Sequence, residues 1–413
     1  MRILHVITQK PFATGSGVYL TGIVEAMGKD HEQHIICGLN QGDEIVLPNT
    51  NHPLTWDSVV FNSTELPFPV PGMSDVMPYQ STLYSEMSDD HAEKMLQVFL
   101  EKIERSIHSF APDLIIFEHL YLLTAEAARW IRSQEDKVAK IPLMGICHGS
   151  ELRQFGNTQR WHQKIREGIG LLDRVVSTHG EQAKQIHAVY QIPRGLIRVL
   201  GSGFDDTLFN LKEGQEEQPM PPNPLQLVYT GKLAKAKGVP ELLNACDQVA
   251  RHHSIHLTLI GGGADPRETA EIEALAAEKS YPIKLTGLLQ QKDIVKIYRQ
   301  SHIFILPSYY EGMPLVVPEA LACGMSVAVT NLPGFSDWLK PFASRVNLIK
   351  RPDMGSMDEP SDEGRLEFTD SIAESILFLA KGLGKSAMPD LSNLTWRGLA
   401  TRLLSSVDKF TNL

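Results

Sequence analysis

The chain has 413 residues, of which 42% are hydrophobic and 21% are charged, a composition typical of soluble globular proteins with two or three domains. The formal net charge of -10 argues against a nucleic-acid binder and against a protein that bulk charge holds to an anionic membrane. Net charge does not report local patches, so peripheral contact with a membrane stays open.

The first residues and the cysteines indicate the compartment. Met1–Thr8 holds one short apolar run, too short for the apolar region of a signal peptide, and no later stretch approaches the length of a membrane span. The cysteines are scattered and form no C-x-x-C pair; they are Cys37, Cys147, Cys246 and Cys323. Disulfides and a structural zinc are therefore not expected, and we predict a cytoplasmic protein.

Short apolar runs alternate with longer helical patterns, which predicts an α/β fold with parallel sheets wound on both faces. The first predicted strands are Ile3–Ile7, His34–Gly38, Asp113–Phe117, Leu143–Cys147, Arg174–Ser177 and Leu196–Leu200. A second set follows at Leu225–Tyr229, His256–Ile260, Ile283–Thr286, Ile303–Leu306 and Ser326–Thr330. Helices are predicted at Val18–Met27, His91–Phe110, Pro240–Arg251, Glu268–Lys279 and Asp293–Gln300.

An acidic, proline-rich segment at 211–224 lacks periodicity and separates the two sets of strands, so we predict an interdomain linker there. One doubly wound domain is expected at 1–210 and another at 225–390, facing each other across a cleft. Thr50–Ser88 is rich in Pro, Ser and Asn and is predicted as an excursion from the first domain. The segment 391–413 contains a further amphipathic helix.

Two motifs of the first half follow predicted strands. Gly15 and Gly17 lie in a loop before a helix, where glycines let the backbone approach an anion. That loop falls short of the dinucleotide pattern G-x-G-x-x-G, and an ordinary flexible turn is the alternative. His148 follows another strand and is a candidate reactive group, with a structural histidine as the alternative. His119 and His179 are weaker candidates of the same kind.

The second half carries two lysines, Lys232 and Lys237, directly after its first predicted strand. Cationic side chains at a strand end suit a pyrophosphate, and a solvated basic loop is the alternative. The glycines of Gly261–Gly263 follow the next strand and by themselves indicate only close packing.

Two carboxylates, Glu311 and Glu319, lie eight positions apart around a turn that precedes a short apolar helix. Backbone N–H groups at such a turn suit a phosphate, and a carboxylate can accept hydrogen bonds from two sugar hydroxyls. The alternative makes Glu311 a helix-start residue and Glu319 an exposed helix residue. Phosphate and hydroxyl recognition in one place suggests a sugar nucleotide as ligand.

These motifs, in this order, resemble the retaining GT-B glycosyltransferases of family 4 (glycosyl transferases group 1) over nearly the whole chain. The family pattern G-[RK]-L-x-x-x-K-G is matched by Gly231–Gly238, and the pattern E-x(7)-E is matched by Glu311 and Glu319. Lys232 stands where the family often has Arg, and Pro318 stands where an apolar helix former is usual. The resemblance implies two Rossmann-like domains, the first for the acceptor and the second for the nucleotide-sugar donor. It also implies that 391–413 crosses back to the first domain.

The resemblance implies a role for each matching residue. Lys232 and Lys237 would hold the pyrophosphate of the donor, and Glu319 would bind its ribose. Backbone groups of the turn would meet the phosphate, at Gly312, Met313, Pro314 and Leu315. Glu311 would meet the transferred sugar.

Further roles concern the nucleobase and the first domain. Gly287 and Leu288 would lie against the nucleobase. Gly17 would close on the diphosphate, and His148 would contact the sugar near the reacting carbon. His148, Glu311 and Lys237 are thus the catalytic candidates.

The implied function is transfer of a hexosyl or N-acetylhexosaminyl group from a UDP- or GDP-linked sugar to a hydroxyl, with retention and without metal or cofactor. The acceptor stays open between an oligosaccharide, a lipid-linked sugar and a small molecule. Two alternatives are a nucleotide-sugar epimerase or hydrolase and a non-catalytic sugar-nucleotide-binding subunit.

Overall fold

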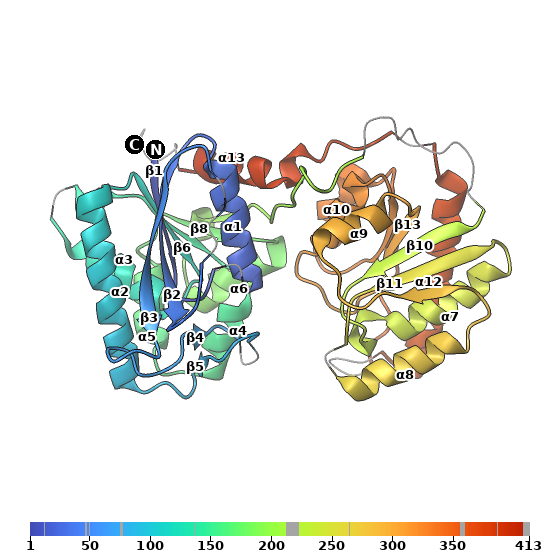
Figure 1. Ribbon diagram of the computed structural model, residues 1–413, viewed down its shortest axis with the longest axis horizontal. Coiled ribbons are helices and arrows are strands. Elements are labelled where there is room, and N and C mark those ends of the chain that lie inside the picture. Colours follow the sequence, from blue (N-terminus) through green and yellow to red (C-terminus); the bar gives the residue numbers. More distant parts are fainter. Residues whose placement is uncertain are drawn as a thin grey trace. The chain divides into compact units, whose positions relative to one another are not determined.

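The computed structural model describes residues 1–11, 13–45, 48, 50–74, 77–135, 137–211, 223–263, 265–355, 360–385 and 387–407 (Figure 1). The chain divides into two compact units: unit 1 with residues 1–203 and 393–413, and unit 2 with residues 204–392. Most of the linker expected at 211–224 lies outside the described residues, as does the end of the expected segment 391–413. The domain limits 1–210 and 225–390 stay predictions.

Unit 1 is built on a parallel sheet with the strand order β3-β2-β1-β6-β7-β8-β9. Its strands are β1 (Arg2–Ile7), β2 (Glu32–Asn40), β3 (Leu54–Phe61), β6 (Leu114–Glu118), β7 (Leu143–Ile146), β8 (Arg174–Ser177) and β9 (Ile197–Val199). Its helices are α1 (Gly15–Met27), α2 (Asp89–Phe110), α3 (Leu122–Ser133), α4 (Ser150–Asn157), α5 (His162–Ile169), α6 (Gly180–Tyr190) and α13 (Trp396–Ser405). A separate parallel pair is formed by β4 (Pro71–Gly72) and β5 (Thr82–Leu83).

Both faces of this sheet are buried. Ile115 and Phe117 of β6 pack in one core with residues of α2, α3, α5 and α6. Leu114 and Ile116 of the same strand pack in a second core with residues of α1 and α13, because successive side chains of a strand point to opposite faces. Burial on both faces explains why the sequence of β6 is continuously apolar until its last residue.

Unit 2 repeats the plan with the parallel order β12-β11-β10-β13-β14-β15. Its strands are β10 (Leu225–Thr230), β11 (Ile255–Ile260), β12 (Ile283–Leu285), β13 (Ile303–Leu306), β14 (Ser326–Thr330) and β15 (Val346–Ile349). Its helices are α7 (Val239–Ala250), α8 (Pro266–Ala277), α9 (Gln291–Tyr298), α10 (Val316–Ala322), α11 (Phe335–Leu339) and α12 (Asp362–Gly382). Helix α12 packs on α7 and on the strands β13, β14 and β15.

The predicted α/β class with two doubly wound units is confirmed, with one difference in the first unit. The segment 50–88, expected as an excursion, supplies β3, which extends the sheet at its edge. An edge strand is half exposed: Trp56 and Val60 are exposed, whereas Val59 and Phe61 are buried. The sequence of β3 therefore mixes polar and apolar residues and lacks the continuous apolar run from which the other strands were predicted.

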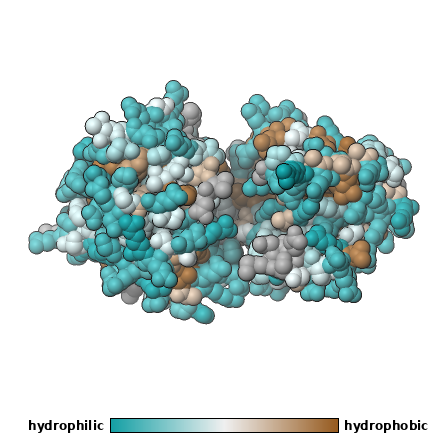
Figure 2. Space-filling view, turned by 90° about the horizontal axis from the view of Figure 1, so that it is seen from below, coloured by the Kyte–Doolittle hydropathy of each residue, from teal (hydrophilic) through white to brown (hydrophobic). Residues whose placement is uncertain are grey.

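The surface seen in Figure 2 is mostly hydrophilic, with hydrophobic residues in small patches. Exposed large apolar side chains accordingly come from separate elements, for example Leu288 after β12 and Phe378 on α12. No helix among the described residues combines the length and hydropathy that a membrane span requires.

Helix α13 docks on α1 within unit 1 through Trp396. A Cβ atom built on Gly22 of α1 would lie 2.2 Å from Cε2 of this indole, and one built on Gly203 would lie 2.4 Å from its Cε3. The indole also meets the Tyr19 ring edge-on, with centroids 5.5 Å apart. Two glycines therefore make the space in which the C-terminal helix anchors.

We expect Gly22→Ala to destabilise unit 1 by about 1–3 kcal/mol, because the added methyl group overpacks Trp396. This cost should outweigh the gain in helix propensity, which is at most about 1 kcal/mol. The measurement is urea unfolding followed by fluorescence. Gly180→Ala is the matched control, because a Cβ there meets no atom within 4 Å. Equal unfolding midpoints for Gly22→Ala and the unmodified protein would contradict this packing.

Candidate functional site

Each sheet has one point where the strand order reverses: between β1 and β6 in unit 1, and between β10 and β13 in unit 2. The loops after the two strands at such a point diverge to opposite faces and leave a crevice at the carboxyl ends of the strands. Lys232, Lys237 and Glu311 all belong to loops that follow β10 or β13. These three predicted residues therefore follow the two strands that flank the reversal point.

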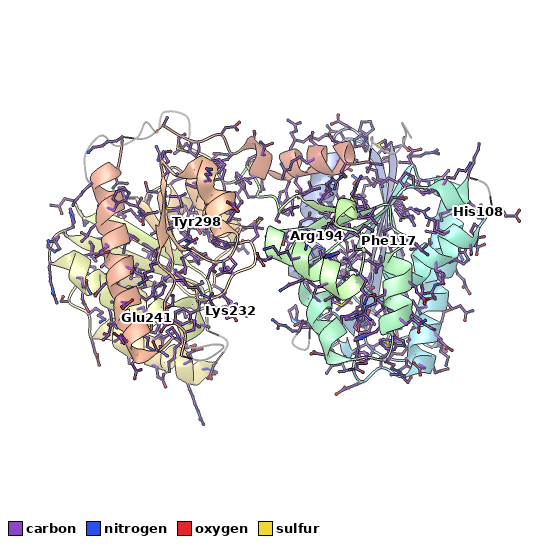
Figure 3. The ribbon with its side chains drawn as sticks, turned by 180° about the vertical axis from the view of Figure 1, so that it is seen from behind. His108, Phe117, Arg194, Lys232, Glu241 and Tyr298 are labelled. Carbon is purple, nitrogen blue, oxygen red and sulfur yellow. The ribbon has the colours of Figure 1, made fainter. Side chains whose placement is uncertain are left out.

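The loop after β10 is held by its own contacts. The Tyr229 hydroxyl donates to the Lys232 carbonyl at 2.6 Å, and the Gly231 N–H donates to the Ile260 carbonyl at 2.9 Å. The Lys232 side chain is exposed on this loop (Figure 3). Gly238 ends the loop with φ +65°, and a Cβ there would lie 2.1 Å from the Pro307 carbonyl oxygen. Glycine at this position thus allows the loops after β10 and β13 to touch.

An ion pair joins these two loops. Lys237 Nζ lies 2.8 Å from Glu311 Oε1, and the Ser308 hydroxyl donates to the same oxygen at 2.7 Å. The Lys237 side chain is 26% exposed and that of Glu311 is 16% exposed, so the pair is partly shielded from water. A backbone hydrogen bond from Tyr309 to Ala236 runs beside it. The structure thus brings two of the catalytic candidates into direct contact.

The neighbouring Lys235 points elsewhere. Its Nζ lies 2.6 Å from Glu271 on α8, and its backbone N–H donates to Glu268 at 2.7 Å. Of the lysines in this loop, Lys237 is the one that the structure joins to Glu311.

Glu319 lies on α10 and is buried, with 7% of its surface exposed. Burial, with a smaller contribution from the charge of Asp205, raises the pKa of Glu319 to about 8. The carboxyl makes no hydrogen bond with the described residues. At neutral pH the carboxyl is therefore mainly protonated. The burial of Glu319 also excludes the alternative interpretation of the sequence, in which Glu319 was an exposed helix residue.

Pro318 precedes Glu319 without breaking the helix. It is the third residue of α10, in the first turn, where backbone N–H groups lack partners inside the helix. The Glu319 N–H still donates to the Leu315 carbonyl at 3.1 Å. The remaining turn residues lie between β13 and α10: Gly312 is exposed, Met313 and Leu315 are half-buried, and Pro314 is buried.

Gly287 and Leu288 lie at the end of β12, away from the reversal point in strand order. Gly261 donates its N–H to the Gly287 carbonyl at 3.0 Å and thereby links the ends of β11 and β12. Leu288 is 86% exposed and lies beside Gly262. Such an exposed apolar side chain is available for contact with a flat ring.

In unit 1 the structure surrounds His148 with buried partners. His148 Nε2 lies 2.6 Å from Glu118 Oε2, and the ring meets the edge of Tyr19 at 5.0 Å between centroids. Glu118 is the last residue of β6, next to β7, and its side chain is fully buried. Burial alone would lower the pKa of His148, but the hydrogen bond and charge of Glu118 and the charge of Glu151 together raise it.

A second carboxylate, Glu151, fastens the same strand ends. It accepts backbone N–H groups of Leu120 at 3.2 Å and His148 at 2.9 Å and lies 3.4 Å from His119 Nδ1. Burial would raise the pKa of Glu151, but the charge and hydrogen bond of His119 and the charge of His148 lower it to about 2. Glu118 and Glu151 were not predicted; the signal was a glutamate that ends the apolar run Leu114–Phe117.

Two other predicted groups have structural partners. The Gly17 N–H donates to the Thr14 hydroxyl at 3.2 Å, so Gly17 is part of the N-cap of α1 rather than of an open loop. His179 is the N-cap residue of α6 and accepts from the Gln182 N–H at 3.2 Å. Of the predicted residues of unit 2, Lys237 and Glu311 are in direct contact, whereas Gly287 and Leu288 lie at the end of another strand, β12. In unit 1, His148 contacts Glu118.

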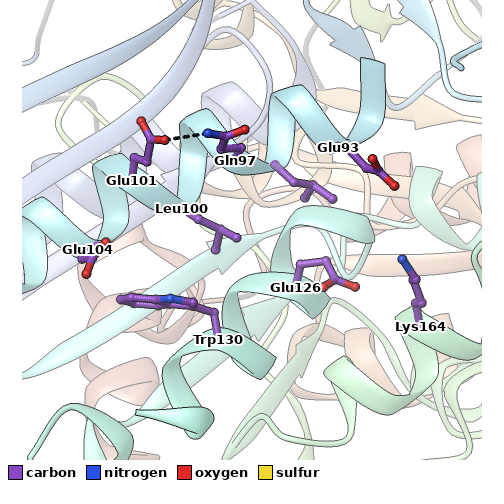
Figure 4. Close-up of a pocket in the computed structure, with 9 residues that line it drawn as sticks. Glu93, Gln97, Leu100, Glu101, Glu104, Glu126, Trp130 and Lys164 are labelled. Atoms are coloured by element: carbon purple, nitrogen blue, oxygen red, sulfur yellow. Dashed lines mark hydrogen bonds between the residues drawn. The ribbon is translucent and has the colours of Figure 1, made fainter. Parts of the chain in front are cut away.

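A hollow with a volume of about 380 Å³ lies on unit 1, but no predicted residue lines it. Figure 4 shows its walls, which come from α2, α3 and α5; they are Glu93, Leu96, Gln97, Leu100, Glu101, Glu104, Glu126, Trp130 and Lys164. Among the residues that the structure describes, no cluster of His, Cys, Asp and Glu side chains has a metal-binding arrangement.

Comparison with known proteins finds similarity to glycosyltransferases, which includes most of the second unit. Residues 212–359 match the family model described as "Glycosyl transferases group 1". A D-inositol 3-phosphate glycosyltransferase from Nocardia farcinica is 26% identical over 41% of this chain and 40% of its own length. An N-acetyl-alpha-D-glucosaminyl L-malate synthase from Bacillus anthracis is 22% identical over 92% of this chain and 88% of its own. The chain spans about half the length of the first curated relatives it matches, 55% and 40% for two of them.

Solved structures share the fold at low identity. Anabaena HepE in complex with UDP and glucose matches 99% of this chain and 100% of its own, with a TM-score of 0.55 and 14% identity. A solved glycosyltransferase from Rickettsia africae matches 99% of this chain and 98% of its own, with a TM-score of 0.63 and 16% identity. The fold is therefore of the GT-B class, with two Rossmann-like domains.

We expect Glu319→Gln to stabilise the protein at pH 8.5 but not at pH 4. The unfolded carboxyl ionises near its ordinary 4.5 and the folded one near 8, so the unmodified protein loses stability as pH rises through this window. The free energy of unfolding of the unmodified protein falls by about 1.4 kcal/mol for each pH unit in this window. The Glu319→Gln variant has no ionisable group at this position and does not show this fall. Thermal unfolding at both pH values measures it. A difference in Tm that is the same at both would show that Glu319 is ionised in the folded protein.

Proposed function

We propose that this protein is a retaining glycosyltransferase that moves a hexosyl or N-acetylhexosaminyl group from a UDP- or GDP-linked sugar to an acceptor hydroxyl. The observation that carries the proposal is the contact of Lys237 with Glu311 at the strand-order reversal of unit 2. A cation that can meet a diphosphate thus lies beside a carboxylate that can meet a sugar. The match of 212–359 to the group 1 family model covers both residues.

In this proposal the diphosphate of the donor binds at the loop after β10. Lys237, half-buried and joined to one carboxylate, exchanges Glu311 for a phosphate oxygen, while the exposed Lys232 meets the second phosphate. Both cations stabilise the charge that develops on the leaving diphosphate. Backbone groups of the turn at Gly312, Met313, Pro314 and Leu315 complete the phosphate contacts.

Glu319 binds the ribose. An ionised carboxylate can accept hydrogen bonds from two hydroxyls, whereas a protonated carboxyl can accept fewer. Hydrogen bonds to the charged form lower the pKa of a carboxyl, so donor binding releases the proton that burial keeps on Glu319 in the empty protein. Leu288 and Gly287 supply an exposed apolar surface for the nucleobase.

Unit 1 supplies the groups for the transferred sugar and the acceptor. In the proposal, His148 donates a hydrogen bond to the sugar near its reacting carbon, and Gly17 at the start of α1 binds the diphosphate. Glu311, released by Lys237, accepts hydrogen bonds from the sugar hydroxyls. The acceptor is an oligosaccharide, a lipid-linked sugar or a small molecule.

The reaction breaks the bond between the anomeric carbon and the phosphate oxygen and forms one to the acceptor oxygen on the same face. The acceptor proton passes to the departing phosphate oxygen. The transition state resembles an oxocarbenium ion, and catalysis rests on positioning and on charge stabilisation. The chemistry as proposed uses no metal ion and no cofactor.

The four cysteines are free thiols, which suits a cytoplasmic protein.

The direct test is incubation of the purified protein with UDP- and GDP-linked sugars, with and without candidate acceptors. Nucleoside diphosphate release that depends on an acceptor, with a product of retained configuration, supports the proposal. Release without any acceptor indicates a hydrolase, and a changed sugar on an intact nucleotide indicates an epimerase. Tight donor binding without turnover indicates a non-catalytic subunit.

Lys237→Ala should lower kcat at least about 100-fold, because it removes charge stabilisation from the leaving group. Thermal stability should change by less than about 1 kcal/mol, since the ion pair is only partly buried. Lys235→Ala is the matched control, because it removes a lysine two positions away that pairs with Glu271 instead. Equal kcat values for the two variants would refute the role of Lys237.

A further inference from the structure

We propose that Glu118 is a positioning residue for His148, which it holds as an imidazolium whose Nδ1–H is the hydrogen-bond donor offered to the ligand. The protonation claim stands on unit 1 alone. Only the identity of that ligand, as the sugar or the acceptor of the transfer, rests on the proposed function.

The two buried carboxylates near His148 differ in their number of hydrogen-bond partners. Glu151 accepts two backbone N–H groups and lies beside His119, so its charge is compensated in several ways. Among the described residues, the Glu118 carboxylate makes a hydrogen bond only with His148, through Oε2, and its buried Oε1 has no hydrogen-bond partner. Neither carboxylate makes an ion pair with a described lysine or arginine. A fully buried carboxylate with one partner is costly unless that partner carries the opposite charge.

The neighbouring side chains of His5, Tyr19 and His119 do not supply a positive charge to Glu118. His5 on β1 interacts electrostatically with Glu118, but burial lowers the pKa of His5 to about 4, so it is neutral at pH 7. Tyr19 on α1 packs on the His148 ring, and burial raises the pKa of its hydroxyl, which also keeps it neutral. His119 on the other side already faces Glu151. His148 is therefore the counter-ion of Glu118.

The two ring nitrogens of His148 have different surroundings. Nε2 lies 2.6 Å from Glu118 Oε2, a distance typical of a charge-assisted hydrogen bond. Nδ1 has no hydrogen-bond partner among the described residues, and 10% of the side chain is exposed. With Nε2–H fixed on Glu118, a neutral ring would present Nδ1 as an acceptor and a charged ring presents it as a donor. His148 thus recognises an acceptor atom, such as a hydroxyl or anionic oxygen, and does not act as a base.

The test is ¹⁵N NMR of the histidine side chains in the ligand-free protein, with the His148 signals assigned from their loss in His148→Gln. At pH 7.5 both ring nitrogens of His148 should carry protons. In Glu118→Gln the ring should be neutral at that pH, and its pKa should fall by about one to three units. Glu126→Gln is the matched control, because Glu126 pairs with Arg129 on α3 and should leave the titration unchanged.

Two results would overturn the proposal: a neutral His148 in the unmodified protein at pH 6.5, or an unchanged titration in Glu118→Gln. If Glu118→Gln does not fold, the protonation state of His148 in the unmodified protein decides alone.

Transfer activity gives an independent readout. The pH at which kcat declines on the basic side should shift downward in Glu118→Gln, which a purely structural role would not produce. A failure of the transferase assignment itself would leave the NMR result untouched.

Discussion

The ion pair between Lys237 and Glu311 couples the two loops that flank the strand-order reversal of unit 2. It lies beside the backbone contact of Tyr309 with Ala236 and the close approach of Gly238 to Pro307. Both charges are partly shielded from water, so leaving either without its partner costs up to about 1 kcal/mol. An anion that takes Lys237 is therefore favoured when it arrives together with groups that satisfy Glu311. A ligand with a diphosphate next to a hydroxyl-bearing sugar does both.

Unit 1 presents a related arrangement at its own strand ends. Glu118 ends β6, which borders the reversal point, and its partner His148 follows the adjacent β7. In both units the carboxylate and its partner follow or end two neighbouring strands of the sheet, β6 and β7 in unit 1 and β10 and β13 in unit 2, rather than belonging to one sequence motif. Glu319 differs from these, because no described lysine or arginine pairs with it and burial raises its pKa to about 8. Among the described residues of these sites, Glu118 and Glu311 thus have partners, whereas Glu319 has a carboxyl that burial shifts toward the neutral form.

The strands buried on both faces were predictable, because a strand such as Ile303–Leu306 is apolar at every position. The edge strand β3 was not, since half of its side chains meet water. Lys237, Glu311 and Glu319 were predictable as site residues because they match the patterns G-[RK]-L-x-x-x-K-G and E-x(7)-E. The partnership of Glu118 with His148 could not be predicted, because 30 residues separate them and only the pairing of β6 with β7 makes them neighbours. The burial of Glu319 also depends on tertiary packing, although the apolar residues around it in the sequence are consistent with burial.

In the proposed function, the diphosphate of a sugar nucleotide binds where Lys237 meets Glu311. A crystal structure of the protein with UDP or GDP would show whether it does. We expect a phosphate oxygen within hydrogen-bond distance of Lys237 Nζ and the ribose hydroxyls on Glu319. A nucleotide bound elsewhere, with the 2.8 Å contact between Lys237 and Glu311 intact and Glu319 still without a partner, would contradict it.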